Sequence, residues 1–218
     1  MSAAKASIQR AYSIGEEIAN SISHGIGFAL GVAALVLLII TAVGHGGGVR
    51  TAAALCMGIT LIVEYLLSTL YHAIQTPRAK SVLRVLDHSA IYLLIAGSYA
   101  PFALVTLNDA GGQLLFAFVC VLAVAGVVAE AITRERQSKW LTIALYLAMG
   151  WAIALHIGDL YHLLDSPAFW LLLGGGISYT IGTVFYVMKG IPYMHFVFHL
   201  FVLAGSVCIT LSALLYVL

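Results

Sequence analysis

Residues 18–44 read IANSISHGIGFALGVAALVLLIITAVG and contain no Asp, Glu, Lys or Arg. About 20 mainly apolar residues in a helix are enough to cross the hydrocarbon core of a bilayer. The segment shows none of the period-2 alternation that is typical of a membrane-spanning strand. It therefore predicts a transmembrane helix over Ile18–Gly44.

The same pattern recurs along the chain. We expect further spans at Thr51–His72, Ser89–Asn108, Ala110–Ala129, Trp140–Leu155, Ser166–Met188 and Pro192–Leu218. The loops between these segments are too short to hold a second domain. The sequence thus predicts an all-α integral membrane protein, with residues 1–218 forming a single seven-transmembrane helix bundle.

The composition supports this class. Of the 218 residues, 62% are apolar and only 9% are charged, whereas soluble domains spend about 25% on charged side chains. A net charge of +1 and the lack of a basic cluster exclude binding to nucleic acid through bulk charge. Membrane lipid is the expected partner, and the cell membrane, typically the bacterial inner membrane, is the expected location.

The basic residues predict the orientation of the bundle. With seven spans the two termini lie on opposite sides of the membrane. Nine Lys and Arg residues fall on the side of the N-terminus, and Arg50 alone falls on the other. Because positive charges collect on the cytoplasmic side, we expect a cytoplasmic N-terminus and an external C-terminus.

The segment before the first span, about residues 1–20, forms a short leader. The first apolar run starts too late and is too long for a cleavable signal peptide. Apolar residues at helical spacing, among them Ile8, Tyr12 and Ile22, indicate an amphipathic helix on the inner leaflet. A plain solvated leader is the alternative.

Polar side chains within membrane spans are costly and often functional, and here they gather at one depth. On the predicted topology, four helix ends bring histidine or carboxylate groups to the cytoplasmic side. They are His24; Glu64, Ser68 and His72; Asp87 and His88; and His195 and His199. Residues four apart share one helical face, so Glu64, Ser68 and His72 project in one direction and so do His195 and His199. Asp87 and His88 are adjacent and point about 100° apart, so both cannot face one atom.

Three imidazoles are the ligand set of an open catalytic zinc site. His72, His195 and His199 are the candidate Zn²⁺ ligands, since the i, i+4 pair supplies two and a neighbouring helix the third. Asp87 would act as general base on water. Ser68 would hydrogen-bond a ligand or polarise a substrate carbonyl. A hydrogen-bonded interior cluster, or interfacial histidines with nothing bound, remains the alternative.

The other polar residues have less defined roles. His88 and His24 are expected to support the site rather than bind metal. Glu64 is either a buried acid, a proton relay or a hydrogen-bonded packing residue. Glu130 stands four residues before Arg134, which predicts a surface ion pair.

Four segments together resemble a known pattern. They are EIANSISH at 17–24, STLYH at 68–72, LDHSAIYLLIAGSYAPF at 86–102 and HFVFH at 195–199. This order of motifs is similar to that of the haemolysin III branch of the progestin and adipoQ receptor family, over almost the whole chain. The short N-terminal segment is typical of bacterial members.

The resemblance implies a seven-helix bundle with a cytoplasmic N-terminus. It also implies that His72, His195 and His199 bind zinc, with Asp87 and Ser68 as the family's aspartate and serine. Adiponectin-receptor members resemble metal-dependent amide hydrolases that act on ceramide-type lipids. The resemblance thus implies a zinc-dependent hydrolase of a lipid amide or ester, with a role in membrane lipid homeostasis.

Two other functions are open at this point. One is a non-enzymatic membrane sensor or regulator with structural zinc. The other is a pore-forming cytolysin, against which stand the absence of a continuous polar stripe on any predicted helix and of a secretion signal.

Overall fold

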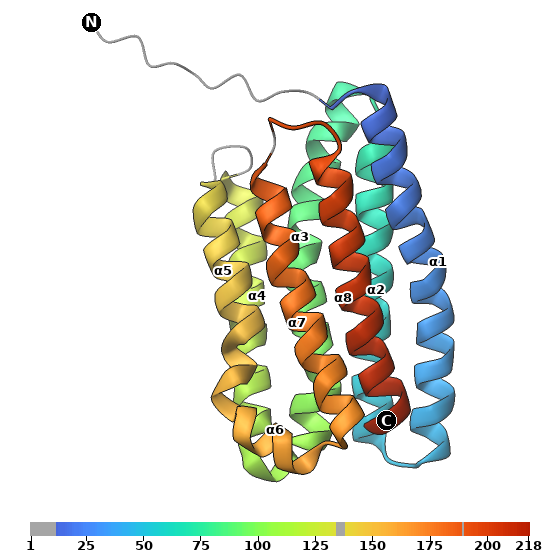
Figure 1. Cartoon of the computed structure of the whole chain (residues 1–218), viewed down its shortest axis with the longest axis vertical. Coiled ribbons are helices and arrows are strands. Elements are labelled where there is room, and N and C mark those ends of the chain that lie inside the picture. The colour runs from blue at the N-terminus through green and yellow to red at the C-terminus, as the bar shows by residue number, and fades with distance from the viewer. Residues whose placement is uncertain (1–11, 134–137, 189) are drawn as a thin grey trace, which may run out of the picture.

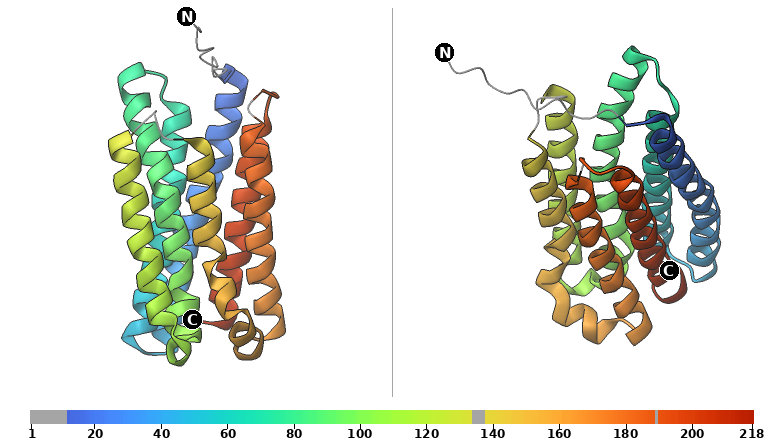
Figure 2. Two further views of the ribbon diagram at one scale, coloured as in Figure 1. Left: turned by 90° about the vertical axis from the view of Figure 1, so that its left-hand side faces the viewer. Right: turned by 45° about the horizontal axis from the view of Figure 1, so that its top comes forward.

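The computed structural model describes residues 12–133, 138–188 and 190–218. Within these residues seven helices are long and apolar enough to cross a membrane. They run roughly side by side, and the start of α1 and the C-terminus lie at opposite ends of the bundle (Figures 1 and 2). The predicted fold class is confirmed.

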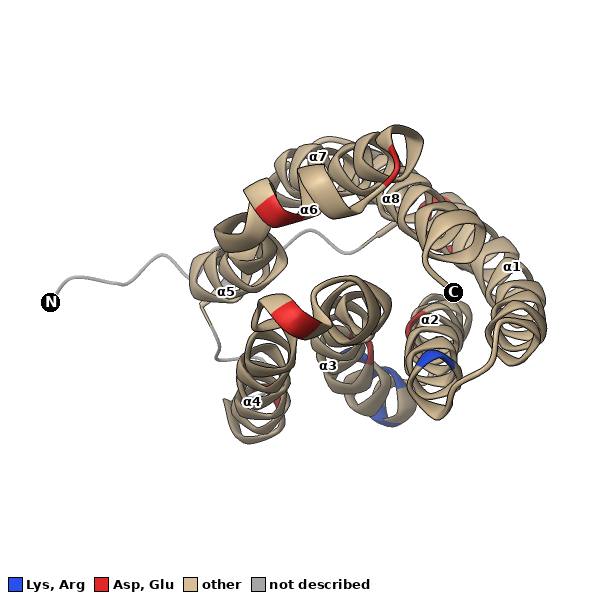
Figure 3. Ribbon diagram, turned by 90° about the horizontal axis from the view of Figure 1, so that it is seen from below, with Lys and Arg blue, Asp and Glu red and all other residues tan. Residues whose placement is uncertain are grey.

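The helices form a ring, in which α3 stands between α2 and α4 when the bundle is seen end-on (Figure 3). In chain order they are α1 (Ile14–Gly44), α2 (Gly48–Ala73), α3 (Pro77–Pro101), α4 (Gly112–Thr133), α5 (Lys139–Trp151), the short α6 (Ile157–Leu163), α7 (Ser166–Val187) and α8 (Met194–Tyr216). Helix α1 packs against both α2 and α8, which closes the ring between the first and last spans.

Two spans differ from the predicted ranges. The third begins at Pro77 rather than Ser89 and runs to Thr106, because α3 continues beyond its uncharged part through the segment that carries Arg78, Lys80 and Arg84. Pro77 occupies the first turn of the helix, where its missing N–H is not needed. The fifth span extends from Trp140 to Leu163, through a 3₁₀ turn into α6.

The predicted leader divides at the start of α1. Residues 1–11 lie outside the described part of the chain, so an amphipathic helix there stays a prediction. Residues 14–20 form the first turns of α1 itself, which begins with a capping box: the Glu16 N–H donates to Ser13 Oγ (3.2 Å), and the Ser13 N–H donates to Glu16 Oε2 (2.8 Å).

Glu16 also ties the first span to the last. Its Oε1 accepts a hydrogen bond of 2.8 Å from the backbone N–H of Tyr193. Tyr193 adopts a left-handed backbone conformation (φ 62°) directly before α8. This contact holds the first turn of α8, and therefore His195, beside the start of α1.

The bundle buries its polar side chains and exposes apolar ones. Along α1, Ile18, Ile22 and Ile26 are each more than half exposed, whereas Glu17 and His24 on the other side of the helix are buried. Apolar side chains that face outward suit a hydrocarbon environment. The interior is the place where this chain assembles polar chemistry.

The orientation in the membrane is a testable prediction. Single cysteines at Ser166 and Ser81, both exposed, would be introduced into a variant lacking the three native cysteines and treated in intact cells with a membrane-impermeant maleimide. We expect labelling at Ser166→Cys, which is the first residue of α7 and lies on the predicted outer side. Ser81→Cys, near the start of α3, should react only after the cells are opened. The reverse pattern would invert the topology.

Candidate metal centre

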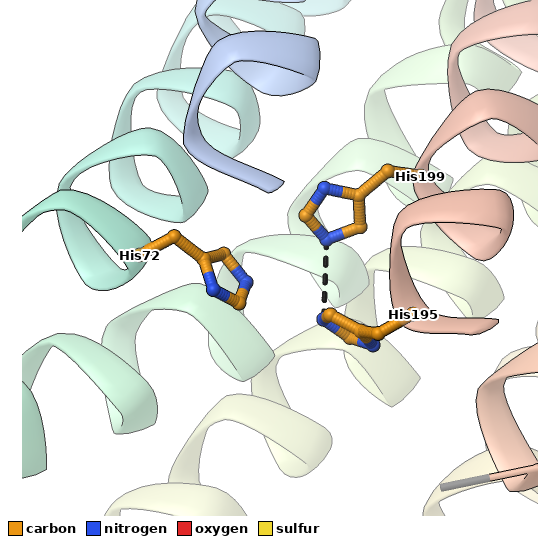
Figure 4. Close-up of side chains that lie close together, drawn as sticks. All are labelled: His72, His195 and His199. Carbon is orange, nitrogen blue, oxygen red and sulfur yellow. Dashed lines mark hydrogen bonds between the residues drawn. The ribbon is translucent and has the colours of Figure 1, made fainter. Parts of the chain in front are cut away.

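Three histidines from two helices meet near the end of the bundle where α1 begins. His72 stands in the last turn of α2, and His195 and His199 occupy the first two turns of α8 (Figure 4). One ring nitrogen of each lies within 4.8 Å of the others. The Nε2 atoms of His195 and His199 are 3.1 Å apart. The three residues predicted as ligands are thus brought together.

The outward-facing ring nitrogens are held by α1. His72 Nδ1 lies 2.7 Å from Glu17 Oε2, and His199 Nδ1 lies 3.2 Å from Ser23 Oγ and 3.3 Å from the backbone oxygen of Asn20. An imidazole that donates from Nδ1 to a carboxylate or carbonyl keeps the lone pair of Nε2 for a metal. Helix α1 therefore orients one histidine from each of the two other helices.

Glu17 is itself supported from α3. Its Oε1 lies 2.6 Å from Lys80 Nζ, and the same ammonium group donates to the backbone oxygen of Tyr71 (3.2 Å). A buried carboxylate needs a compensating charge or several hydrogen bonds. The Lys80 contact provides that charge, so Glu17 can face His72 as a carboxylate.

The donor set fits a metal ion. His72 Nε2 is buried and has no hydrogen-bond partner among the described residues, an arrangement that costs roughly 1–3 kcal/mol when nothing satisfies the nitrogen. With Zn–N bonds of about 2.0–2.1 Å in a tetrahedral site, two nitrogen ligands lie roughly 3.3 Å apart, close to the separation of the His195 and His199 Nε2 atoms. Neutral imidazoles suit zinc and several other transition metals.

Tyr12 covers the cluster from the segment before α1. Its ring stacks on that of His195, with centroids 5.0 Å apart and planes at 23°, and its centroid is 5.9 Å from that of His72. Burial raises the pKa of Tyr12 most, and nearby hydroxyl and carboxyl groups, Asp87 among them, raise it further. The phenol therefore keeps its proton and can donate a hydrogen bond beside the histidines.

The remaining predicted site residues take different positions. Asp87 is buried on α3, within electrostatic range of Tyr12. Ser68 is buried one turn before His72. His24 stacks on His199, with centroids 3.6 Å apart and planes at 15°. It packs against the ligand ring and is not among the three grouped ligand residues.

Two candidates are not brought to the histidines. Glu64 lies about two turns before His72 in α2 and lines an apolar cavity. His88 faces α4, where its Nδ1 lies 3.1 Å from Glu130 Oε1. The predicted surface role of Glu130 is wrong: this residue is only 1% exposed, because α3 and α4 pack closely enough for His88 to reach it.

Sequence reasoning missed three residues that shape the site, namely Glu17, Ser23 and Tyr12. Glu17 and Ser23 contribute through contacts with helices more than 50 positions away in the chain. The sequence feature that could have indicated Glu17 is the pair of carboxylates, Glu16 and Glu17, at the very start of an otherwise uncharged span. Tyr12 lies before that span and carried no motif.

A helical bundle with apolar outer faces and an interior cluster of three histidines defines a membrane protein whose helices bring together a group that could hold a metal ion. The chain matches the family model described as haemolysin-III related over residues 12–210. It is 43% identical over 203 residues to Hemolysin-3 of Bacillus cereus, covering 93% of this chain and 92% of that protein. It is 42% identical over 205 residues to a Hemolysin-3 homolog of Bacillus subtilis (strain 168), covering 94% and 96%.

The chain therefore belongs to the haemolysin III-related family. Together with the seven apolar helices, this makes it a multi-pass integral membrane protein.

The Glu17–His72 contact generates a prediction about metal affinity. Glu17→Gln should weaken zinc binding by about 10–100-fold, the usual effect of removing a partner that orients a metal-binding histidine. Affinity would be measured by competition with a chromophoric chelator on the purified protein.

Glu130→Gln is the matched control, since Glu130 is also a buried glutamate bonded to a histidine, away from the cluster. Its zinc affinity should equal that of the wild type. An unchanged affinity in Glu17→Gln would remove the orienting role.

Proposed function

We propose that this protein is a zinc-dependent intramembrane hydrolase that cleaves an amide or ester bond of a membrane lipid, with a role in membrane lipid homeostasis. The observation that carries the proposal is the cluster of His72, His195 and His199, in which His72 and His199 are buried and His195 is partly buried. Three protein ligands are typical of catalytic zinc sites, whereas structural sites are usually closed by four.

The proposed ligands are those three histidines, through the nitrogens that face one another. When bound, zinc would act as a Lewis acid towards the scissile carbonyl and would acidify a water molecule. Glu17 and Ser23 would keep the imidazole rings of His72 and His199 in place during the reaction.

Asp87 would take the proton from the attacking water and return it to the leaving amine or alcohol. Ser68 would donate a hydrogen bond to the carbonyl oxygen. Tyr12, whose phenol ring stacks on that of His195, would donate a second one. Donors fixed in advance around a developing negative charge lower the barrier without reorganising.

A cavity next to the cluster supports a lipid substrate. It has a volume of about 130 Å³ and extends between α3, α5, α7 and α8. Its walls are mostly aliphatic and aromatic, and Phe198 belongs both to the wall and to the surroundings of the histidines, with its ring 5.4 Å from His195 and 5.8 Å from His199. An acyl chain would lie in this cavity while the bond near its head group faces the metal.

The proposed topology agrees with this substrate. With the N-terminus in the cytoplasm, the cluster lies at the cytoplasmic end of the bundle, near the depth at which acyl chains join their head groups. A lipid of the inner leaflet would then reach the site without crossing the bilayer.

The central test separates chemistry from metal binding. Asp87→Ala should retain zinc and lose turnover by about 10²–10⁴-fold, the usual contribution of a general base. His195→Ala should lose the metal. Zinc would be measured by elemental analysis of the purified protein, and turnover by mass spectrometry of lipids extracted from wild-type and variant cells.

A non-enzymatic sensor with structural zinc predicts a different result. The cellular effect of the protein would then survive Asp87→Ala but not His72→Ala. Retained zinc in His195→Ala would instead overturn the ligand assignment.

A further inference from the structure

Glu64 is a carboxyl group in the wall of an apolar cavity. Its side chain is 2% exposed, it lines the cavity between α3, α5, α7 and α8, and its Oε2 atom has no hydrogen-bond partner among the described residues. Burying a polar atom without a partner costs roughly 1–3 kcal/mol. A bound molecule that hydrogen-bonds this carboxyl group would offset that cost.

The other hydroxyl groups in the cavity wall are already bonded within the protein. Ser98, Thr180 and Thr183 donate to backbone oxygens about one turn earlier in their own helices. Tyr146 donates to a backbone oxygen of α3, and the Tyr179 hydroxyl pairs with that of Ser206. Tyr99 likewise donates to the backbone of α5. Among the described residues that line the cavity, Glu64 is therefore the polar side chain with a buried oxygen that makes no hydrogen bond within the protein.

The position of Glu64 along α2 indicates how far from the histidines a polar group of the ligand would have to lie. Glu64, Ser68 and His72 follow one another at four-residue spacing on one face of α2, and all three are buried. With a rise of 1.5 Å per residue, Glu64 lies about 12 Å along the helix from His72. A chain whose head is at the histidines would pass Glu64 well beyond its first few carbons.

We propose that Glu64 is a specificity-determining residue that hydrogen-bonds a neutral polar group, above all a hydroxyl, part-way along the acyl chain of a lipid held in this cavity. The proposal rests on the proposed function for the place of the head group and adds the class of chain. A hydroxyl group can both donate to and accept from a carboxyl group. A plain saturated chain would leave the buried oxygen unpartnered, so the site discriminates against it.

The test compares the retention of two free fatty acids, stearic acid and its mid-chain monohydroxylated analogues, by the zinc-loaded protein in nanodiscs. Retained acid is quantified by mass spectrometry, with empty nanodiscs subtracted. We expect the best-placed hydroxylated acid to be retained about tenfold better than stearic acid, which is the effect of one hydrogen bond to a buried group. Equal retention of all the acids by the wild type overturns the proposal without recourse to any variant.

Three variants locate the effect. Glu64→Leu should abolish the preference while binding stearic acid at least as well as the wild type. Glu64→Gln, which keeps a donor and an acceptor, should retain most of it. Ser98→Ala is the matched control, because its hydroxyl is already bonded to Ile95, and it should leave the preference unchanged. A preference that survives in Glu64→Leu, or is lost in Glu64→Gln or Ser98→Ala, contradicts the assignment.

These outcomes are separate from those of the hydrolase test. Free fatty acids contain no bond for the site to hydrolyse, so the ratio of retained acids does not depend on turnover. A protein that prefers the hydroxylated chain but cleaves no lipid would contradict the proposed function and leave the role of Glu64 intact. The reverse result would do the opposite.

Discussion

The contact between Glu17 and His72, supported by Lys80, is the interaction on which the site depends. It joins α1, α2 and α3 through one carboxylate. In an interior of low dielectric, such a bridge is strong when complete and expensive when broken. The close packing of Gly27 on Tyr65 turns the same side of α1 towards α2. The polar contacts and the small residues of the first span therefore favour one rotation of α1 against the bundle.

Few residues build the histidine cluster, because each of three helices supplies either histidines or their hydrogen-bond partners. Helix α8 contributes two candidate ligands, His195 and His199, whose i, i+4 spacing places them on one face of a rigid helix. Helix α2 contributes the third from its last turn. Helix α1 adds no ligand but holds both outer nitrogens through Glu17, Ser23 and the Asn20 backbone. Several of these polar groups are tolerated in hydrocarbon because they hydrogen-bond one another, whereas His72 Nε2 is left without a partner among the described residues.

How much was predictable differs between the fold and the site. Uncharged runs such as residues 18–44 identified the seven helices, since hydropathy directly reflects the bilayer as solvent. The start of the third span was missed because Arg78 and Lys80 end the apolar run while the helix itself continues. His72, His195 and His199 were found from spacing and shared depth. Glu17 was not assigned to His72, because that pairing depends on how α1 and α2 pack. Glu130 was assigned by a local rule to a surface pair with Arg134, which lies outside the described residues, whereas the packing of α3 against α4 buries Glu130 and brings it to His88.

The ring closes between its first and last members. Glu16 binds the backbone at Tyr193 just before α8, and the α1 contacts of His199 lie within the next two turns. During synthesis α1 to α7 have therefore left the ribosome before α8 can bring His195 and His199 to His72. Assembly of the histidine cluster has to wait for the insertion of α8, and a chain truncated before that helix would hold the isolated His72 without the means to complete the cluster.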